Sequence, residues 1–227
     1  INGVATPVIE LPAGQVTRVR LLNLDNTVTY RLNLPGCEAK IYAIDGHPVE
    51  PRDFVDQYWI GPGMRLELAI RGPAAGQELS MRDGVVRLAT IRGVEPTKAG
   101  SADWPAALPA NPVSEPDLEK AETINFKFEW VGAMTDYSQG QQAPSLWQIN
   151  GVAWQGGEEH KHSGPPLAKL ELGKSYIFTL RNMTQYQHPI HLHGMTFKVL
   201  DSNRRKIIPY YSDTYLLGKN ETARVAL

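Results

Sequence analysis

Cysteine, long apolar runs and an excess of charge of one sign are what this 227-residue sequence lacks. Its single cysteine, Cys37, excludes an internal disulfide and says little about the redox compartment. No apolar run approaches the roughly 20 residues that a membrane-spanning helix needs. The 23 basic and 24 acidic residues give a net charge of −1, which favours neither a nucleic-acid partner nor an anionic membrane.

A helical period is also missing, and short stretches with strand character are bounded by Gly, Pro, Asn and Asp instead. The clearest stretch is 123–130, where Ile124, Phe126 and Phe128 alternate with polar residues. Many short strands separated by turns predict an all-β protein made of β-sandwiches. The expected strands are residues 16–24, 30–34, 39–44, 65–70 and 85–91, then 123–130, 175–182, 190–200, 213–217 and 222–227.

The sequence contains an internal repeat. The opening residues 1–5 (INGVA) recur letter for letter as residues 149–153. Further matches at one constant offset are Pro7 with Pro166, Gly14 with Gly173 and Asn23 with Asn182. Residues 61–70 align with residues 218–227 after a small deletion. The chain therefore holds two copies of one unit.

The two copies define the expected domain layout. The first copy covers residues 1–95 and the second covers residues 123–227. Residues 96–122 are rich in Pro, Ala and acidic residues, which indicates a linker lying over the surface. Within this linker we expect at most one turn of helix, near residues 116–120.

Three of the six histidines fall within six residues, in the segment 188–194 (HPIHLHG). If the residues after Pro189 are extended, His191 and His193 project to the same face, and His188 enters from the turn before them. Imidazole is the commonest metal ligand among side chains and suits copper, zinc and iron. Buried imidazoles without metal would need several polar partners. We therefore predict a metal site.

The two copies differ at the positions of these histidines. At the constant offset, His191 and His193 fall on Leu32 and Leu34, so the first copy is expected to be a packed, metal-free sandwich. The second copy also contains an eleven-residue insertion, residues 154–164, that the first copy lacks. Insertions usually form surface loops and often shape sites.

Other chemically reactive side chains are given more ordinary roles. We interpret Cys37 as a small structural residue, and His47 as structural too. For His160 and His162, in the insertion, a solvated loop is the default, and a substrate-side or accessory metal role stays open. Asp213 is interpreted as a hydrogen-bond anchor rather than a proton donor.

The copies lack complementary pieces. A strand precedes the INGVA segment only in the second copy, and the strand at residues 85–91 has no counterpart after Leu227. The chain opens on Ile1, with neither an initiator methionine nor a signal peptide. We therefore expect both sandwiches to be incomplete and the chain to be a processed or cut piece.

The HPIHLHG segment resembles the third copper-binding motif of the multicopper oxidases, which include laccases and bacterial copper-resistance oxidases. Residues 18–23 (RVRLLN) and 61–66 (GPGMRL) resemble the family's second cupredoxin domain. Residues 180–182 (LRN) and 212–214 (SDT) resemble its third. The resemblance implies two cupredoxin-like Greek-key β-sandwiches in tandem, with the metal-free second domain at residues 1–95 and the third domain at residues 123–227.

The same resemblance implies a role for each histidine. His188 would be a ligand of the type 1 copper, His191 of the type 2 copper, and His193 of one copper of the type 3 pair, with no catalytic residues beyond the metal ligands. The intact parent would hold four copper ions. It would couple one-electron oxidation of a phenol, an amine or a reduced metal ion to reduction of oxygen to water. The family also implies a periplasmic or secreted location.

Two parts of the family pattern are missing. The first two copper motifs belong to a first domain, and the fourth, a His-Cys-His run with an axial Met, should follow Leu227. One ligand for each centre is too few to hold copper tightly, so we expect copper to be absent or partial and the chain alone to be inactive. The expected partners are oxygen, a small-molecule or metal-ion substrate, and the missing first domain and C-terminal segment.

Two alternatives remain open at this point. One is a copper-free, cupredoxin-like periplasmic scaffold, although a scaffold could use leucine at these positions as the first copy does. The other is a cupin-type dioxygenase that uses an HxH motif. That class needs a further histidine downstream, and none follows His193.

Overall fold

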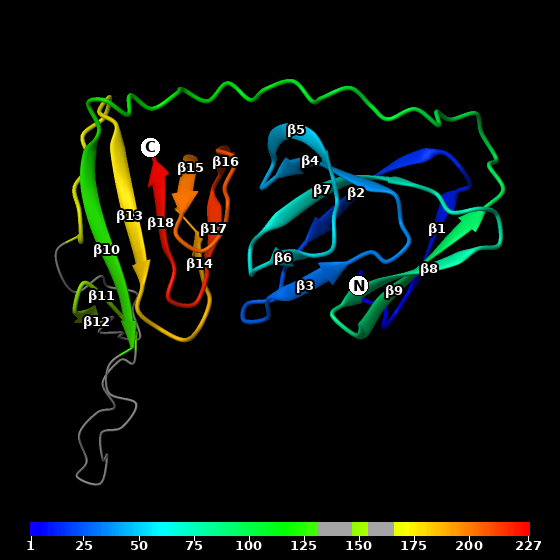
Figure 1. Cartoon of the computed structure of the whole chain (residues 1–227), viewed down its shortest axis with the longest axis horizontal. Helices are drawn as coiled ribbons and strands as arrows, with labels where there is room; N and C mark the ends of the chain where they lie inside the picture. Colours follow the sequence, from blue (N-terminus) through cyan, green and yellow to red (C-terminus); the bar gives the residue numbers. More distant parts are fainter. Residues whose placement is uncertain (131–146, 154–165) are drawn as a thin grey trace, which may run out of the picture. The chain divides into compact units, whose positions relative to one another are not determined.

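The structure is a computed structural model that describes residues 1–130, 147–153 and 166–227. Every regular element in these residues is a strand (Figure 1). The chain divides into two compact units: Ile1–Pro112 with Tyr211–Leu216, and Val113–Tyr210 with Leu217–Leu227. The described part has no helix long and apolar enough to cross a membrane. The insertion 154–164, with His160 and His162, lies outside the described residues.

The first unit contains two sheets, in the orders β1-β9-β8-β3-β6 and β2-β7-β4-β5. β1 and β9 pair in parallel, and the other registered pairs are antiparallel. Both sheets contribute to one apolar core, for example through Leu68 and Ile91. The strands are β1 (Val8–Pro12), β2 (Val16–Leu22), β3 (Tyr30–Asn33), β4 (Ala39–Ile44), β5 (His47–Asp53), β6 (Tyr58–Ile60), β7 (Arg65–Arg71), β8 (Glu78–Asp83) and β9 (Val86–Val94).

The second unit is built on one sheet in the order β12-β11-β10-β13-β18-β15-β16. Its core includes Phe178, Phe197 and Val225, which are buried. The chain passes from the second unit into the first at β16 and returns at Leu217. The strands that follow residue 113 are β10 (Glu122–Trp130), β11 (Trp147–Ile149), β12 (Val152–Ala153), β13 (Tyr176–Asn182), β14 (His188–His191), β15 (Phe197–Ser202), β16 (Tyr210–Ser212), β17 (Thr214–Leu217) and β18 (Thr222–Ala226), and most of β16 and β17 belongs to the first unit.

The repeat predicted from the sequence is present in the backbone. The order β2-β7-β4-β5 recurs as β13-β18-β15-β16, and β4 and β15 each carry one irregularity in register against the strand beside them. Asn2 and Gly3 have φ angles of 50° and 76°, and Asn150 and Gly151 have 53° and 77°. Positive φ at both residues is what a type I′ Asn-Gly turn requires. The same letters therefore fold into the same turn in both copies.

A buried side chain closes the turn before the last matched strand of each copy, but its chemistry differs. Gly61 donates its N–H to the Met64 sulfur at 3.2 Å in the first copy. In the second copy Gly218 donates its N–H to the Glu221 carboxylate, which also accepts a hydrogen bond from the Ser202 hydroxyl. The fold therefore needs an acceptor at this position and accepts either a thioether or a carboxylate.

Most of the strands predicted from the sequence are confirmed within a few residues, and β4 agrees at both ends. The prediction of one continuous strand over residues 190–200 is wrong, because a turn separates β14 from β15. In that turn the Met195 N–H donates to the Leu192 carbonyl at 3.3 Å, and Gly194 adopts a φ of 70°. A positive φ costs glycine little, so Gly194 allows the chain to turn where the apolar pattern suggests a continuous strand.

The first part of the linker lies along the sheet β2-β7-β4-β5. The Val16 N–H donates to the Ser101 carbonyl at 2.9 Å, and the Tyr42 hydroxyl donates to the Pro105 carbonyl at 2.7 Å. The Trp104 ring lies 5.2 Å from the Lys40 ammonium and 4.9 Å from the Arg71 guanidinium carbon. These cation–π contacts hold Trp104 against the surface of this sheet.

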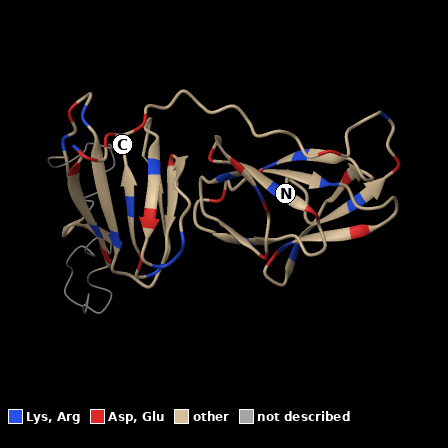
Figure 2. Ribbon diagram, turned by 45° about the horizontal axis from the view of Figure 1, so that its top comes forward, with Lys and Arg blue, Asp and Glu red and all other residues tan. Residues whose placement is uncertain are grey.

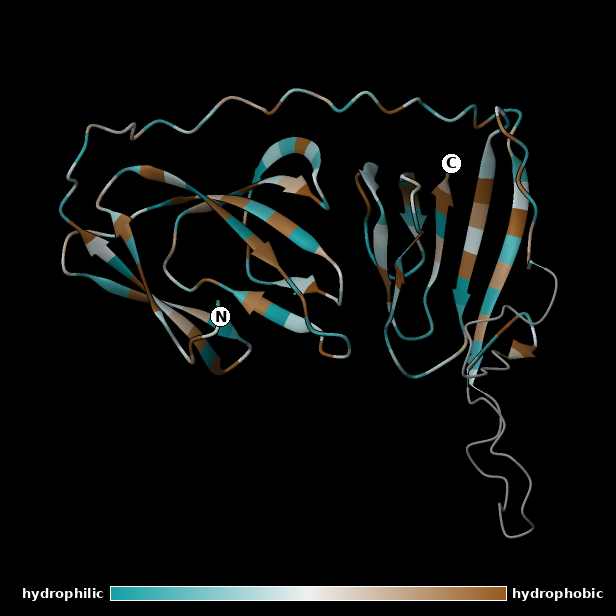
Figure 3. Ribbon diagram, turned by 180° about the vertical axis from the view of Figure 1, so that it is seen from behind, coloured by the Kyte–Doolittle hydropathy of each residue, from teal (hydrophilic) through white to brown (hydrophobic). Residues whose placement is uncertain are grey.

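Charge and hydropathy follow the strands. Figure 2 shows Lys and Arg interspersed with Asp and Glu in both units, as the balanced composition predicts. Figure 3 shows hydrophobic and hydrophilic residues alternating along β10. In β10, Ile124 and Phe126 are half-buried while Asn125 and Lys127 are exposed, which confirms the alternation predicted for this strand.

Candidate metal centre

A buried asparagine anchors the loop that precedes the histidines. Asn182 ends β13, and its side-chain amide donates to the carbonyls of Tyr186 at 2.6 Å and Gly218 at 2.8 Å. Its side-chain oxygen accepts the Thr184 N–H at 2.8 Å. All three bonds stay inside the loop or join it to the turn before β18, so residues 182–188 are held in one conformation.

The first copy uses the matching asparagine in the same way. Asn23 donates to the carbonyls of Val28 at 2.8 Å and Ile60 at 2.9 Å, and accepts the Asp25 N–H at 3.0 Å. Each loop is therefore held by an asparagine in the same position, and the loops differ in the side chains that follow it.

His188 is half-buried among aromatic side chains at the start of β14. Its Nε2 lies 2.9 Å from the Thr184 hydroxyl oxygen. Its ring stacks on Phe128 with a centroid distance of 6.2 Å and an interplanar angle of 21°. It meets Trp147 edge-on at 4.8 Å and 83°. Burial lowers the pKa of His188, so the ring is neutral at pH 7, as a metal ligand must be.

His191 and His193 form a pair of exposed imidazoles. Their ring centroids are 5.1 Å apart at an interplanar angle of 61°. The rings come together as the sequence predicts, although a turn after β14 brings them there rather than a continuous strand. His188 contacts a different set of side chains. Within the described residues, no group of three or more His, Cys, Asp or Glu side chains is arranged to hold a metal.

The aromatic surroundings of His188 were missed by sequence reasoning. Trp130, Trp147 and Tyr186 contact one another with ring centroids 4.8 to 5.9 Å apart. The Trp130 indole N–H is buried and has no hydrogen-bond partner among residues 1–130, 147–153 and 166–227. The only available signal was the density of aromatics at residues 126–130, which suits an ordinary core strand equally well.

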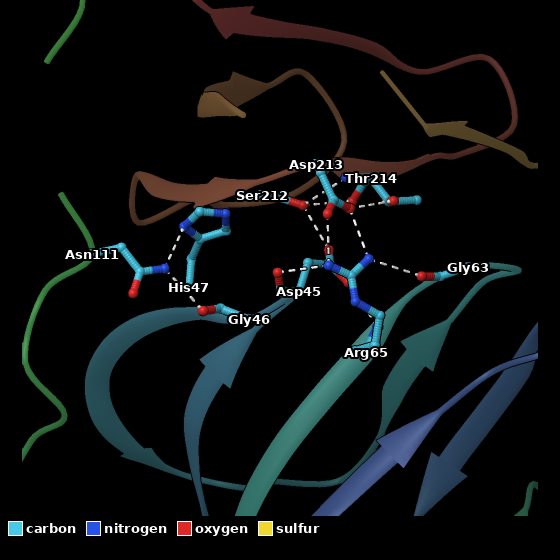
Figure 4. Close-up of polar contacts among 9 residues, drawn as sticks. All are labelled: Asp45, Gly46, His47, Gly63, Arg65, Asn111, Ser212, Asp213 and Thr214. Carbon is cyan, nitrogen blue, oxygen red and sulfur yellow. Dashed lines mark hydrogen bonds and ion pairs between the residues drawn. The ribbon is translucent and has the colours of Figure 1, made fainter. Parts of the chain in front are cut away.

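A second polar cluster lies within the first unit, where residues 211–216 are found (Figure 4). The Asp45 carboxylate is fully buried. It accepts hydrogen bonds from the backbone N–H of Arg65 at 2.7 Å and from the Ser212 hydroxyl at 2.6 Å. The Arg65 guanidinium donates to both carboxylate oxygens of Asp213, at 2.8 and 2.6 Å. The Thr214 hydroxyl donates to Asp213 at 2.7 Å. These bonds give Asp213 the anchoring role expected from the sequence.

The electrostatics of this cluster favour structure over chemistry. Burial raises the pKa of Asp45, although hydrogen bonds from Ser212 and Arg65 oppose the effect. The Asp213 carboxylate, through its hydrogen bonds, raises the pKa of Arg65. Both carboxylates are occupied by donors of this chain, so the cluster stabilises residues 211–216 and offers no set of open ligands.

His47 lies beside this cluster and accepts a hydrogen bond from the Asn111 side-chain amide at 3.1 Å, through Nδ1. Burial lowers the pKa of His47, Arg65 lowers it further, and the Asp213 carboxylate opposes them. The folded chain therefore binds the proton less tightly than the unfolded chain, whose histidine pKa is about 6.5. The stability that His47 contributes is complete above that pH and is lost as the pH falls below it.

We expect His47→Gln to lose less stability than the wild type when the pH is lowered from about 7.5 to about 5. Glutamine has no proton to take up, and its side-chain oxygen can still accept from Asn111. The measurement is the urea midpoint of each protein at both pH values. An NMR titration that places the pKa of His47 at or above the ordinary value would contradict the expectation.

Cys37 follows a tight turn, in which its N–H donates to the Leu34 carbonyl at 3.1 Å. Burial raises the pKa of the Cys37 thiol to about 11, so the thiol is protonated at pH 7. A half-buried, protonated thiol agrees with the small structural role predicted for Cys37.

Comparison with known proteins identifies the class to which this fold belongs. A multicopper oxidase family profile matches residues 131–227. Multicopper oxidase MmcO of Mycobacterium tuberculosis is 27% identical over 224 residues, which cover 89% of this chain and 40% of MmcO. The crystal structure of a multicopper oxidase from Pseudomonas parafulva superposes with a TM-score of 0.86 and 61% identity, covering 100% of this chain and 52% of that one.

A second structure, the multicopper oxidase from Pseudomonas thermotolerans, superposes with a TM-score of 0.85 and 57% identity, covering 98% of this chain and 50% of that one. The units are thus cupredoxin-like β-sandwiches in tandem, and the predicted all-β class is confirmed. The chain belongs to the multicopper oxidase family. It spans about half the length of these relatives.

Proposed function

We propose that this chain supplies three copper ligands to a multicopper oxidase. His188 would bind the type 1 copper, His191 the type 2 copper, and His193 one copper of the type 3 pair. The single observation that supports this most strongly is the pair of imidazoles at 191 and 193, whose centroids lie 5.1 Å apart. The first copy has Leu32 and Leu34 at the matching positions, and both are buried in its core.

The proposal gives the two copies different tasks. Residues 1–95 would be the second, metal-free cupredoxin domain, residues 96–122 the linker, and residues 123–227 the third cupredoxin domain. In the first copy, Leu32 at 2% exposure leaves no room for a metal. In the second copy the exposed His191 and His193 can be reached by ligands from other segments.

The residues present fit copper. Neutral imidazole is a preferred ligand of copper, and burial keeps His188 neutral. Bound copper would supply the one-electron redox chemistry. The chain's own residues would set ring orientation and solvent access, through Thr184, Phe128 and Trp147 at His188.

The intact parent would hold four copper ions. It would couple one-electron oxidation of a phenol, an amine or a reduced metal ion to the reduction of oxygen to water, in the periplasm or outside the cell. A first domain and a C-terminal segment of the same protein would supply the thiolate, the axial ligand and the other imidazoles. By itself the chain would hold copper weakly or not at all and would be inactive.

The test uses the full-length protein that contains this chain. We expect His188→Leu to abolish the blue absorption of the type 1 copper, because one of its ligands is removed. The double variant His191→Leu, His193→Leu restores the residues of the first copy and should lose the type 2 and type 3 signals. Each change should abolish oxygen uptake, and copper content and electron paramagnetic resonance spectra report which centre is lost.

His47→Gln is the matched control, because it removes an imidazole from the metal-free copy and should keep full copper content. A double variant that retains all its copper would contradict the ligand assignment and favour the copper-free scaffold. Oxygen uptake by the 227-residue chain alone would contradict the proposal that the chain is inactive.

A further inference from the structure

We propose that Thr184 is a positioning residue for His188. Its hydroxyl oxygen accepts the Nε2–H of the imidazole, fixes the ring as the Nε2–H tautomer, and leaves Nδ1 as the bare nitrogen. The tautomer is a property of the chain without metal. Only the further step, that Nδ1 is the atom that meets the copper, rests on the proposed function.

The number of hydrogen bonds that the Thr184 hydroxyl can make favours donation from the His188 Nε2–H to the hydroxyl oxygen. Three groups lie within reach of its oxygen: the Tyr186 N–H at 3.2 Å, the Tyr186 carbonyl at 3.4 Å and the His188 Nε2 at 2.9 Å. A hydroxyl has one proton and two lone pairs. If its proton goes to the carbonyl, the lone pairs accept both N–H groups and all three contacts are hydrogen bonds. If the proton goes to Nε2, the contact with the carbonyl is lost.

The geometry of the Thr184 side chain is fixed by its neighbours. Thr184 is 4% exposed. Its N–H donates to the Asn182 side chain at 2.8 Å, and its carbonyl accepts the Asn220 N–H at 3.2 Å. A hydroxyl on so constrained a backbone gives a fixed acceptor for the imidazole, which preorganises the ring at little further entropic cost.

Two aromatic rings fix the remaining freedom of the imidazole. Phe128 stacks on the face of His188, and Trp147 meets it edge-on. Together with the bond from Nε2 to Thr184, these contacts set the plane of the ring and the direction of Nδ1. Histidines that bind metals almost always donate their other ring N–H to an oxygen acceptor, and Thr184 supplies that oxygen here.

The repeat shows how the second copy differs at this position. At the constant offset, Asp25 matches Thr184 and Thr29 matches His188. Asp25 uses its carboxylate to accept the N–H groups of Thr27 and Val28, each at 2.8 Å. A carboxylate next to an imidazole would favour the imidazolium, which binds no metal. The neutral hydroxyl of Thr184 accepts the matching backbone N–H, that of Tyr186, without favouring the imidazolium.

The test is long-range proton–nitrogen correlation NMR on the 227-residue chain with labelled histidine, at about pH 8, where free imidazole is neutral. We expect His188 to show the Nε2–H tautomer alone. Thr184→Val, which removes the acceptor, should give a mixture of both tautomers, and Thr184→Ser should restore the single form. Thr123→Val, the same change at an exposed position of β10, is the control and should leave His188 unchanged.

An Nδ1–H tautomer in the wild type would overturn the proposal, and so would a Thr184→Val spectrum identical to that of the wild type. The wild-type spectrum decides even if Thr184→Val fails to fold.

Measurements of copper binding by the full-length protein distinguish the positioning role of Thr184 from the proposed function, on which the last step of the inference rests. We expect Thr184→Val to weaken type 1 copper binding about 10- to 100-fold and to shift its absorption, with rescue by serine. If His188→Leu leaves the type 1 signal intact, the proposed function fails while the tautomer result stands. If the signal needs His188 but Thr184→Val leaves it unchanged, the positioning role is overturned.

Discussion

Arg65→Ala is expected to lower the free energy of unfolding by about 3 kcal/mol, the lower end of the range for breaking a buried ion pair. The substitution removes both hydrogen bonds to Asp213 and the cation 3.6 Å from the buried Asp45 carboxylate. Two carboxylates then keep their charges without a cation, and one of them has no access to water. The lower end applies because Arg65 itself is one-third exposed.

The measurement is a urea denaturation curve, with Arg224→Ala as the matched control. Arg224 also pairs with an aspartate, Asp201, but both side chains are about half exposed, so its loss should cost at most about 1 kcal/mol. The cost of Arg65→Ala should shrink at acidic pH, because burial already raises the pKa of Asp45 and protonation removes its charge. A cost equal to that of the control would show that the cluster in Figure 4 contributes no more than a surface pair.

Gly93→Ala should destabilise the first unit by about 3 kcal/mol or more. A Cβ at this position of β9 would lie 2.2 Å from the carbonyl oxygens of both Pro73 and Ala74. Those atoms belong to the backbone, so no rotamer change relieves the clash. The segment is held in place, because Gly93 donates its N–H to the Gln77 carbonyl at 3.0 Å and accepts the Gly76 N–H at 2.9 Å.

Gly76→Ala is the control for this prediction. Gly76 has a φ of 79° and open space where its Cβ would lie, so alanine there meets conformational strain alone, about 1–2 kcal/mol. Thermal denaturation followed by circular dichroism compares the two variants. If they lose the same stability, the close approach of the backbone at Gly93 has no energetic weight.

Local patterns in the sequence were sufficient for the class of fold. Alternation of apolar and polar residues predicted β10, and the recurrence of residues 1–5 predicted two copies of one unit, which the structure shows as the same Asn-Gly turn in both. The pairing of His191 with His193 was also predicted from spacing, although a turn after β14, and not the extended strand that was expected, brings the rings together. These features depend on residues close together in the chain, whose conformational preferences act locally.

The spacing rule failed where glycine permitted another conformation. Residues 190–200 have the composition of one strand, yet Gly194 adopts a positive φ and the strand divides into β14 and β15. Periodicity cannot separate a continuous strand from two strands joined by such a turn, since both leave the same apolar pattern.

The sequence by itself determined the all-β class, the duplication and the family motif at residues 188–194, because each depends on composition or on short, fixed spacings. Only the tertiary structure decided which groups surround those histidines. Thr184, Phe128 and Trp147 meet His188 through a buried loop and two neighbouring strands. Asp45 and Asp213, which bind the same Arg65, are far apart in the sequence. Contacts between such distant segments depend on strand order and register, and no local preference encodes them.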